Sequence, residues 1–263
     1  MFIERVLNET DSVKTILFKD RVSSKAEPGQ FLMVWIPGVE ELPMSVMVAD
    51  EVDSAAITIR RKGIGSTALF NKRIGEMLGI RGPYGNNFKI APNARTVLLV
   101  GGGTGLVPLI RLAAKLNEMR ICCRLIIGAN SKREVFFENT ADAVLSDTKH
   151  KIIVSTENGD YGFKGTATDA MTQVLKEETF DSVYTCGPEL MMKKVLAIAS
   201  AYSLPIQASL ERHMKCGIGI CASCCIEDKL VCKDGPVFCE KQLSKMNEFG
   251  MYYRDKTGRK IVY

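Results

Sequence analysis

Three closely spaced cysteines near the end of the chain, with a fourth soon after, could hold an iron–sulfur cluster. Cys216, Cys221 and Cys224 follow the pattern C-x4-C-x2-C, and Cys232 comes eight residues after Cys224. This triple spacing suits a [2Fe–2S] cluster, because four thiolates must converge on two iron atoms. Glycines within the first interval let the backbone bend closely, so that amide N–H groups can face the cluster sulfurs. The pattern predicts a [2Fe–2S] cluster in this segment.

The fourth ligand has three candidates. Cys225 adjoins Cys224, so the two side chains would be strained if they reached different ligand positions. Cys239 lies beyond a Gly-Pro turn that should lead the chain away from the cluster. Cys232 leaves seven residues in which the chain can loop back, and it is favoured over the other two. The alternative to a cluster is a zinc site, but zinc sites usually pair C-x2-C with a second C-x2-C or with histidines, and this segment has neither.

A glycine-rich loop in the middle of the chain has the position of a dinucleotide-binding turn. The run Gly101-Gly102-Gly103-Thr104-Gly105 stands between an apolar stretch and a helical pattern. At such a turn a pyrophosphate meets the amide groups of a helix N-terminus, and glycines let the backbone approach it. A second turn, Cys186-Gly187-Pro188, follows another predicted strand. Both turns are candidates for nucleotide contact. A purely structural turn is the alternative for the first, because Leu106 breaks strict G-x-G-x-x-G spacing.

The elements that would position these motifs fall into three regions. Residues 1–92 contain short strand-like runs separated by turn residues, which predicts a small antiparallel β-barrel. Residues 93–208 alternate between strands and helices, which predicts a parallel sheet of βαβ units. Residues 209–263 have little periodic structure, as expected for a small domain stapled by metal. The predicted strands are 12–18, 30–36, 56–60, 96–100, 124–128, 151–155 and 182–186, and the predicted helices lie at 106–116 and near 132–147, 166–177 and 188–202.

Composition and charge exclude several classes of function. The chain has 263 residues, enough for two or three domains, and 46% of them are hydrophobic. The net charge of +5 is spread along the chain without a basic block, so nucleic acid is not an expected partner. Apolar runs are shorter than the ~18 residues of a membrane span, so no membrane partner is expected. The first residues lack the apolar core of a signal peptide. With five of nine cysteines crowded into residues 216–232, we expect a cytoplasmic protein whose thiolates bind metal.

Further short motifs run through the chain in an order that resembles one known family. They are Pro43-Met44-Ser45, Thr58-Ile59-Arg60, Gly63-Ile64-Gly65-Ser66, Gly82-Pro83-Tyr84-Gly85-Asn86, the two turns above, residues 157–165 and the cysteine motif that closes at Phe238. With these motifs the chain resembles the ferredoxin–NADP reductase superfamily. Within it, the chain is most similar to the electron-transfer subunits of type B dihydroorotate dehydrogenases, and the resemblance covers nearly the whole sequence.

The resemblance implies cofactors and sites that spacing alone would not name. It implies an antiparallel FAD-binding barrel, a nicotinamide-binding α/β domain and a small C-terminal [2Fe–2S] domain. NAD would contact the two turns, and Cys216, Cys221, Cys224 and Cys232 would hold the cluster. FAD would contact Leu42, Pro43, Met44, Ser45, Thr58, Ile59, Arg60, Gly65 and Ser66.

The resemblance also implies a partner. FMN and the dihydroorotate site would lie on a separate catalytic subunit, in a hetero-oligomer with two copies of each chain. Electrons would pass from that FMN through the cluster and FAD to NAD+, in pyrimidine biosynthesis. No residue of this chain is expected to take part in the oxidation of dihydroorotate itself.

Two departures and two alternatives accompany this reading. Leu42 stands where the family has an arginine near the flavin phosphates, so Arg60 or Arg61 is the candidate source of that charge. The loop between the third and fourth ligands is shorter than in many members.

A ferredoxin- or sulfide-linked NAD(P)H oxidoreductase subunit is one alternative function. Cys216 favours the dihydroorotate dehydrogenase interpretation, because those other subunits can carry aspartate at this position. A non-catalytic zinc-binding module is the other. NAD is preferred over NADP from the family, against a weak basic signal at Lys132-Arg133.

Overall fold

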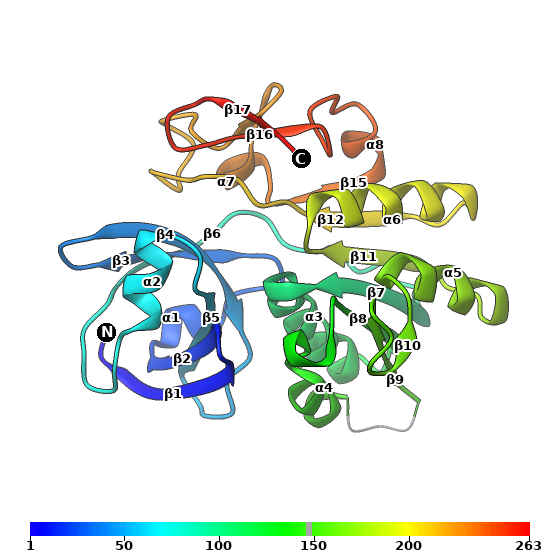
Figure 1. The fold of residues 1–263 in the computed structure, drawn as a ribbon, viewed down its shortest axis with the longest axis horizontal. Helices are drawn as coiled ribbons and strands as arrows, with labels where there is room; N and C mark the ends of the chain where they lie inside the picture. The colour runs from blue at the N-terminus through cyan, green and yellow to red at the C-terminus, as the bar shows by residue number, and fades with distance from the viewer. Residues whose placement is uncertain (146–148) are drawn as a thin grey trace.

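The computed structural model describes residues 1–145 and 149–263, which form three parts that meet along one junction (Figure 1). An N-terminal sheet lies beside a second sheet flanked by helices, and the C-terminal segment lies across both. Among the described residues, no helix has the length and apolar character required to cross a bilayer. The chain order of the three parts follows the sequence expectation, while the exact boundaries at residues 92 and 208 stay predictions.

The N-terminal part is an antiparallel sheet that closes into a barrel. Its strands run in the order β1-β2-β5-β4-β3-β6. The two ends of the sheet meet because Ile3 N donates to Glu76 O at 2.9 Å and Leu78 N donates to Met1 O at 2.8 Å. Inward-facing apolar side chains such as Ile16, Phe18 and Ile57 fill the interior. The strands are β1 (Ile3–Thr10), β2 (Val13–Lys19), β3 (Phe31–Ile36), β4 (Glu40–Met47), β5 (Ser54–Arg60) and β6 (Gly79–Tyr84).

Two short helices accompany the barrel, α1 (Arg21–Ser24) and α2 (Ile64–Phe70). Helix α2 begins directly after β5, where Ser66 Oγ accepts hydrogen bonds from the amides of Lys62 at 3.0 Å and Gly63 at 2.9 Å. Its far end is anchored by the buried side chains of Leu69 and Phe70. The start of α2 is thereby fixed beside the ends of β4 and β5.

The second part is a sheet in the order β10-β9-β8-β7-β11-β12-β15, parallel from β10 to β12. Helices α3 and α4 pack against each other, as do α5 and α6. The strands are β7 (Thr96–Gly102), β8 (Cys122–Ala129), β9 (Lys151–Thr156), β10 (Phe163–Lys164), β11 (Ser182–Cys186) and β12 (Ile206–Ser209). The helices are η1 (Gly103–Gly105), α3 (Leu106–Glu118), η2 (Lys132–Glu134), α4 (Glu138–Val144), α5 (Ala167–Glu177) and α6 (Glu189–Ala201).

Strand β7 shows why the parallel sheet was readable from the sequence. Its residues 97–100 are fully buried, as expected for a strand covered on both faces. Val97 and Leu99 belong to the core beneath α3, whereas Leu98 and Val100 belong to the core beneath α5 and α6. A continuous apolar run is therefore required here instead of an alternating one.

The prediction of a single helix near residues 132–147 is wrong. The stretch 132–147 forms η2 and the short α4 instead, and residues 146 and 147 lie outside the described part of the chain. The break falls at Phe136 and Phe137, which are both buried. Phe137 has φ of 68° and so adopts the left-handed conformation, which ends one helical segment and starts another. Burial of two aromatic side chains thus overrides the helical pattern.

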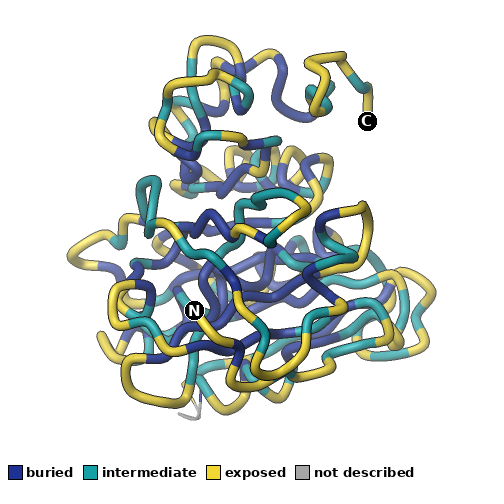
Figure 2. The backbone as a smooth tube through the Cα atoms, turned by 90° about the vertical axis from the view of Figure 1, so that its left-hand side faces the viewer, coloured by how far each residue is buried: buried dark blue, intermediate teal, exposed yellow. Residues whose placement is uncertain are grey.

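The C-terminal part has few regular elements, and Figure 2 shows that much of its backbone is exposed. Its buried side chains share one core with the other parts, including Met33 of β3 and Met192 of α6 beside Cys224, Ile226 and Phe238. Strand β15 joins the second sheet by antiparallel pairing with β12. The elements are β13 (Cys225–Ile226), β14 (Lys229–Leu230), α7 (Val231–Asp234), β15 (Val237–Cys239), α8 (Glu240–Leu243), β16 (Tyr252–Arg254) and β17 (Lys260–Val262).

A half-buried arginine joins the barrel to the second part. Arg111 of α3 donates to three barrel carbonyls, Ser24 O at 2.6 Å, Ala26 O at 2.7 Å and Met47 O at 3.0 Å. Burial lowers the pKa of Arg111 from its ordinary value, but a guanidinium keeps its proton in proteins. Beside it, Lys115 pairs with Glu27. These contacts fix the two sheets relative to each other and so define the cleft between them.

Candidate cofactor sites at the junction of three parts

The cysteine loop presents its backbone amides to its own sulfurs. Cys216 Sγ accepts from the amides of Ile218, Ile220 and Cys221 at 3.4–3.5 Å. Cys232 Sγ accepts from Gly219 N at 3.2 Å, and Cys224 Sγ accepts from Cys232 N at 3.4 Å. Several N–H donors aimed at sulfur are what anionic thiolates and a bound cluster require. The loop is therefore shaped for sulfurs that carry negative charge.

The protonation of the sulfurs differs across the site. Although burial opposes it, the three amide donors lower the pKa of Cys216 to about 6. Burial, followed by the neighbouring Cys224 thiol, raises the pKa of Cys232 to about 12. Cys216 is thus a thiolate at neutral pH, whereas Cys232 gives up its proton when a metal cation binds.

The four sulfurs form two pairs. Cys216 hydrogen-bonds Cys221, and Cys224 hydrogen-bonds Cys232. Within the described residues, no three His, Cys, Asp or Glu side chains converge on a single metal position. Two pairs of thiols fit a two-iron cluster, in which each iron takes two protein ligands, better than they fit one zinc ion. The donor set therefore fits the cluster expected from the spacing.

The competing cysteines lie elsewhere. Cys225 pairs with Leu230 in the β13–β14 hairpin. Cys239 is exposed on β15, opposite Gln207 of β12, and its backbone amide donates to the side chain of Gln242 in α8. Cys232 as the fourth ligand remains a prediction, and the geometry favours it.

The loop is held against the barrel by close contacts. Gly217 has φ of +73°, and a Cβ there would lie 2.7 Å from Met33 Cγ, so only glycine suits this position. Asn86 forms a three-bond clamp on the segment after Cys232. Its Nδ2 donates to Asp234 O at 3.1 Å and to Val237 O at 2.9 Å, and its Oδ1 accepts from Val237 N at 2.9 Å. The motif at residues 82–86 thus contacts the cysteine segment directly.

The two glycine turns of the second part touch each other at the point where the strand order reverses. Strands β7 and β11 are neighbours, with Gly101 opposite Cys186. A Cβ on Gly105 would lie 2.5 Å from the carbonyl of Cys186, and one on Gly187 would lie 2.9 Å from Gly102 O. In open α/β sheets, ligands bind at the carboxyl ends of strands where the order reverses. The two turns predicted from the sequence are therefore brought together at such a point.

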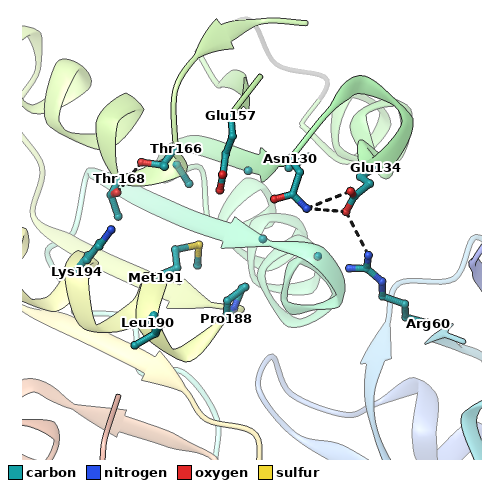
Figure 3. Close-up of a pocket in the computed structure, with 15 residues that line it drawn as sticks. Arg60, Asn130, Glu134, Glu157, Thr166, Thr168, Pro188, Leu190, Met191 and Lys194 are labelled. Atoms are coloured by element: carbon teal, nitrogen blue, oxygen red, sulfur yellow. Dashed lines mark hydrogen bonds and ion pairs between the residues drawn. The ribbon is translucent and has the colours of Figure 1, made fainter. Parts of the chain in front are cut away.

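A cavity of about 300 Å³ opens beside these turns (Figure 3). Gly102, Gly103 and Pro188 line it, with Thr168 and Lys194 at one side and Arg60 and Glu134 at the other. Thr104, Gly105, Cys186 and Gly187 support the cavity from the adjacent turns without lining it. Its size suits part of a dinucleotide, with the remainder extending out of the cleft.

Arg60 brings the barrel to the edge of this cavity. It ends β5, and its guanidinium donates to Glu134 at 3.2 Å. Glu134 also accepts from Asn130 Nδ2 at 3.0 and 3.1 Å. Arg60 was expected at the flavin, and the structure puts its side chain at the nucleotide cavity. Arg61 lies over the ring of Phe70 at 5.2 Å, and its role as the source of charge missing at Leu42 stays a prediction.

The remaining residues expected at FAD differ in what they offer a ligand. Residues 42–45 are half-buried along β4, beside α2. Thr58 and Ile59 are buried in the barrel, and Thr58 Oγ1 shares a hydrogen bond with Thr15 Oγ1 at 2.9 Å. The side chains of Thr58 and Ile59 therefore pack inside the barrel and do not face a ligand outside it.

The start of α2, the other expected FAD segment, is already occupied by protein groups. The Glu40 carboxylate lies directly over Gly65, in the space a side chain there would occupy. Ser66 Oγ already caps two amides of the chain. A ligand placed at this helix start must therefore share the space with Glu40.

Two charged residues beside Cys186 at the junction, Lys62 and Glu211, escaped the sequence interpretation. The surrounding protein desolvates Glu211 and raises its pKa although the residue keeps access to solvent, while the nearby Lys62 ammonium lowers it. Burial, and then the Glu211 carboxylate, raise the pKa of Cys186, which stays a neutral thiol. These residues come from all three parts, so no local pattern signals that they meet.

The start of α6 is tied to the C-terminal part by a buried ion pair. Arg212 donates to both carboxylate oxygens of Glu189. Glu189 also accepts from Gly250 N at 2.7 Å and from Tyr263 OH at 2.8 Å. Because Glu189 directly follows Pro188, this network links the wall of the nucleotide cavity to the segment that leads into the cysteine loop.

Comparison with known proteins identifies an iron–sulfur-binding segment and an NAD-binding part in this chain. Residues 211–244 match the family described as "Iron-sulfur cluster binding domain of dihydroorotate dehydrogenase B", and residues 99–196 match "Oxidoreductase NAD-binding domain". A protein of Methanocaldococcus jannaschii named "Probable dihydroorotate dehydrogenase B (NAD(+)), electron transfer subunit" is 41% identical over 99% of this chain and 97% of its own length. A protein of Pyrococcus furiosus with the same name is 39% identical over 96% of both.

Solved structures confirm the fold class. The structure described as an NADH-dependent reduced ferredoxin-NADP oxidoreductase matches with a TM-score of 0.81 and 29% identity, over 91% of this chain and 88% of that one. The ferredoxin reductase of carbazole 1,9a-dioxygenase has a TM-score of 0.69 and 23% identity, over 79% of this chain and 67% of that one. The barrel followed by an α/β part is thus the fold of ferredoxin–NADP reductase relatives, and a C-terminal iron–sulfur segment is added here.

Proposed function

The chain belongs to the family of electron transfer subunits of dihydroorotate dehydrogenase B, and on this premise we propose that it passes electrons from a dihydroorotate-oxidising partner to NAD+ in pyrimidine biosynthesis. In the balanced reaction, dihydroorotate loses two electrons and two protons to become orotate. NAD+ takes up both electrons and one proton as a hydride, and the second proton goes to solvent. A [2Fe–2S] cluster supplies single-electron transfer and FAD supplies conversion between single electrons and hydride.

The observation that carries this proposal is the place of the cysteine loop. The loop contacts Met33 of the barrel at Gly217, and Asn86 of the barrel holds the segment that follows the loop. The segment before the loop is tied through Arg212 to the wall of the nucleotide cavity. Electrons move between centres only over short distances, so a cluster site at the junction suits a relay. Cys216, Cys221, Cys224 and Cys232 would hold the cluster.

The nucleotide and flavin assignments follow the same geometry. The amides of Gly102 and Gly103 would receive the pyrophosphate of NAD, with Pro188 closing the cavity from α6. Cys186, buried and neutral, would face the nicotinamide without charge. Ser45 on β4 would hydrogen-bond the edge of the flavin ring, and Gly65 and Ser66 at the start of α2 would lie beside its phosphates.

The partner surface is proposed at the exposed side of the cysteine loop. Ile218 is 48% exposed and Ile220 is 78% exposed, although both are apolar and flank the cluster ligands. Val237, an apolar residue of the same segment, is 4% exposed and is already packed in the core of this chain. Binding of an FMN-containing catalytic subunit would cover the two isoleucines and bring the two redox chains together, in a complex with two copies of each chain.

The test is co-purification with the dihydroorotate dehydrogenase of the same cell, followed by assays of each chain alone and of the complex. We expect dihydroorotate-dependent reduction of NAD+ by the complex only. We expect no residue of this chain to act as the base against a substrate C–H, which such an oxidation needs. Reduction of NAD+ by dihydroorotate with this chain alone would refute the division of labour.

A second candidate function has one observation in its favour. The match to the NADH-dependent reduced ferredoxin-NADP oxidoreductase covers most of both chains. This chain could serve a ferredoxin- or sulfide-linked NAD(P)H oxidoreductase instead. Failure to bind any dihydroorotate dehydrogenase, together with ferredoxin-dependent reduction of NAD+ or NADP+, would favour that function.

A further inference from the structure

One arginine of the barrel reaches the cysteine loop. Arg81 of β6 donates from its NH2 group to the carbonyl of Cys216 at 3.2 Å. The same guanidinium is gripped by Glu41 of β4, with Nε to Oε1 at 2.8 Å and NH2 to Oε2 at 2.6 Å. Its central carbon also lies 5.7 Å from the centre of the Tyr84 ring. A two-pronged carboxylate contact fixes a guanidinium in both position and plane.

The position of this ion pair in the sheet connects two expected cofactor sites. In the barrel, Met33 of β3 stands opposite Arg81 on one side and opposite Pro43 on the other. Pro43 lies in the segment expected to hold the flavin ring, and Met33 packs against Gly217 of the cysteine loop. Arg81, Met33 and Pro43 thus form a row across three strands from the cysteine loop to the flavin segment.

We propose that the Arg81–Glu41 ion pair is a positioning and tuning device for the cluster, which holds the Cys216 end of the loop on the barrel and sets the local charge there. This inference rests on the proposed function only in that the four cysteines hold a [2Fe–2S] cluster. Arg81 acts through the Cys216 backbone and does not itself touch the reacting atoms, so it is a positioning residue.

The electrostatic effect has a defined sign for each partner. A reduced cluster carries one more negative charge than an oxidised one. A guanidinium that is hydrogen-bonded to the carbonyl of the ligand Cys216 therefore favours reduction. Glu41 offsets much of that cation. Loss of the arginine leaves an unpaired anion beside the loop, and loss of the glutamate leaves an unpaired cation. The two losses should therefore move the reduction potential in opposite directions.

The exposure of the pair makes the test practical. The side chains of Arg81 and Glu41 are 41% and 22% exposed, and ion pairs with this access to water contribute little to folding stability. Variants of either residue are therefore expected to fold. Solvent will screen part of the effect on the cluster but cannot reverse its sign.

The experiment uses the full-length, cluster-loaded protein. We would measure the midpoint potential of the cluster in R81Q, E41Q and the double variant by EPR-monitored redox titration, with iron content and visible circular dichroism as measures of intact cluster. We expect a lower potential in R81Q, a higher one in E41Q and a value near that of the parent protein in the double variant. R81K should keep the potential close to the parent value but alter the dichroism of the cluster, because lysine lacks the two-pronged grip.

Controls and refuting outcomes are available in the same chain. Arg124 and Glu178 form a comparable two-pronged pair in the second part, so R124Q and E178Q should leave the potential unchanged. Shifts of the midpoint potential in the same direction in R81Q and E41Q, or no shift in either variant, would overturn the proposal. If R81Q lost its cluster, E41Q alone would decide, since only a raised potential there supports the device. These readouts need no dihydroorotate, so they stand apart from the test of the physiological partner.

Discussion

Replacing Asn86 by alanine should loosen the cysteine segment from the barrel. The Asn86 side chain makes three hydrogen bonds to the backbone at Asp234 and Val237, at 2.9–3.1 Å. These bonds join residues that are 148 to 151 positions apart in the chain. Alanine removes all three while it leaves the backbone bond from Asn86 N to Gly235 O available. The variant therefore isolates the contribution of one side chain to the docking of the cysteine segment.

The size of the effect follows from the bonds that are lost. A protein hydrogen bond contributes a net ~1 kcal/mol, and the bond to Asp234 O is exposed to solvent whereas the two at Val237 are partly buried. We therefore expect the free energy of opening the segment to fall by about 2–3 kcal/mol. Because about 1.4 kcal/mol corresponds to a factor of ten, the open state should become about 30- to 150-fold more populated.

Native-state hydrogen exchange measures this population. The Leu210 amide is a suitable reporter, because it donates to Pro236 O at 2.9 Å inside the clamped segment and does not contact Asn86 itself. Its exchange should accelerate by the factor given above, and iron release to a chelator should accelerate with it. Both readouts come from the full-length protein.

The neighbouring Asn87 provides the matched control. Its side chain donates to the adjacent Phe88 O at 3.3 Å and accepts from Lys89 at 2.8 Å, so its contacts are local. Asn87→Ala should leave exchange at Leu210 within a few-fold of the parent protein. If the two alanine variants behaved alike, the clamp would not be what docks the cysteine segment.

Three further predictions concern the cofactors. Cys232→Ser should remove or shift the visible absorption of the cluster while Cys225→Ser and Cys239→Ser leave it in place, and the reverse pattern between Cys232 and Cys239 would reassign the fourth ligand. Gly65→Leu should release flavin, measured as the ratio of flavin to protein, because a side chain at this position meets Glu40 and fills the start of α2; unchanged flavin content would show that the wrong loop was chosen. Diaphorase assays should give a higher kcat/KM for NADH than for NADPH, because the Glu157 carboxylate lines the cavity and would repel a 2′-phosphate; a preference for NADPH of more than about tenfold, roughly 1.4 kcal/mol, would contradict it.

The parallel sheet was predictable from the sequence because both of its faces are covered. Strand β7 is a continuous apolar run, strands β8, β9 and β11 contain shorter apolar runs, and the sequence expectations for all four are confirmed. Three of the six barrel strands were missed, β1, β4 and β6, because most of their residues are exposed or half-buried. A strand with little buried surface leaves a weak apolar pattern.

The candidate site was predictable only where its chemistry is local. The spacing of the cysteines predicted that four thiolates converge on a cluster, and each glycine turn was predicted to contact the nucleotide. The structure adds that the two turns touch each other. Arg81 and Cys216 are 135 positions apart in the chain, and their contact depends on the way the C-terminal part lies on the barrel. Lys62 and Glu211 likewise meet only through the arrangement of all three parts. No spacing rule reaches such pairs, because Arg81, Lys62 and Glu211 each look like an ordinary surface charge in the sequence.

The shared core of the C-terminal part has a consequence for electron transfer. Its buried side chains pack with Phe31 and Met33 of the barrel and with Met192 of α6, and β15 completes the second sheet beside β12. A segment whose core includes side chains of the two other parts cannot fold as an independent module on a flexible linker. The cysteine loop therefore holds one distance to the flavin segment and one to the nucleotide cavity. For a relay this is an advantage, because transfer rates fall steeply with distance, and a fixed cluster site needs no search before each electron moves.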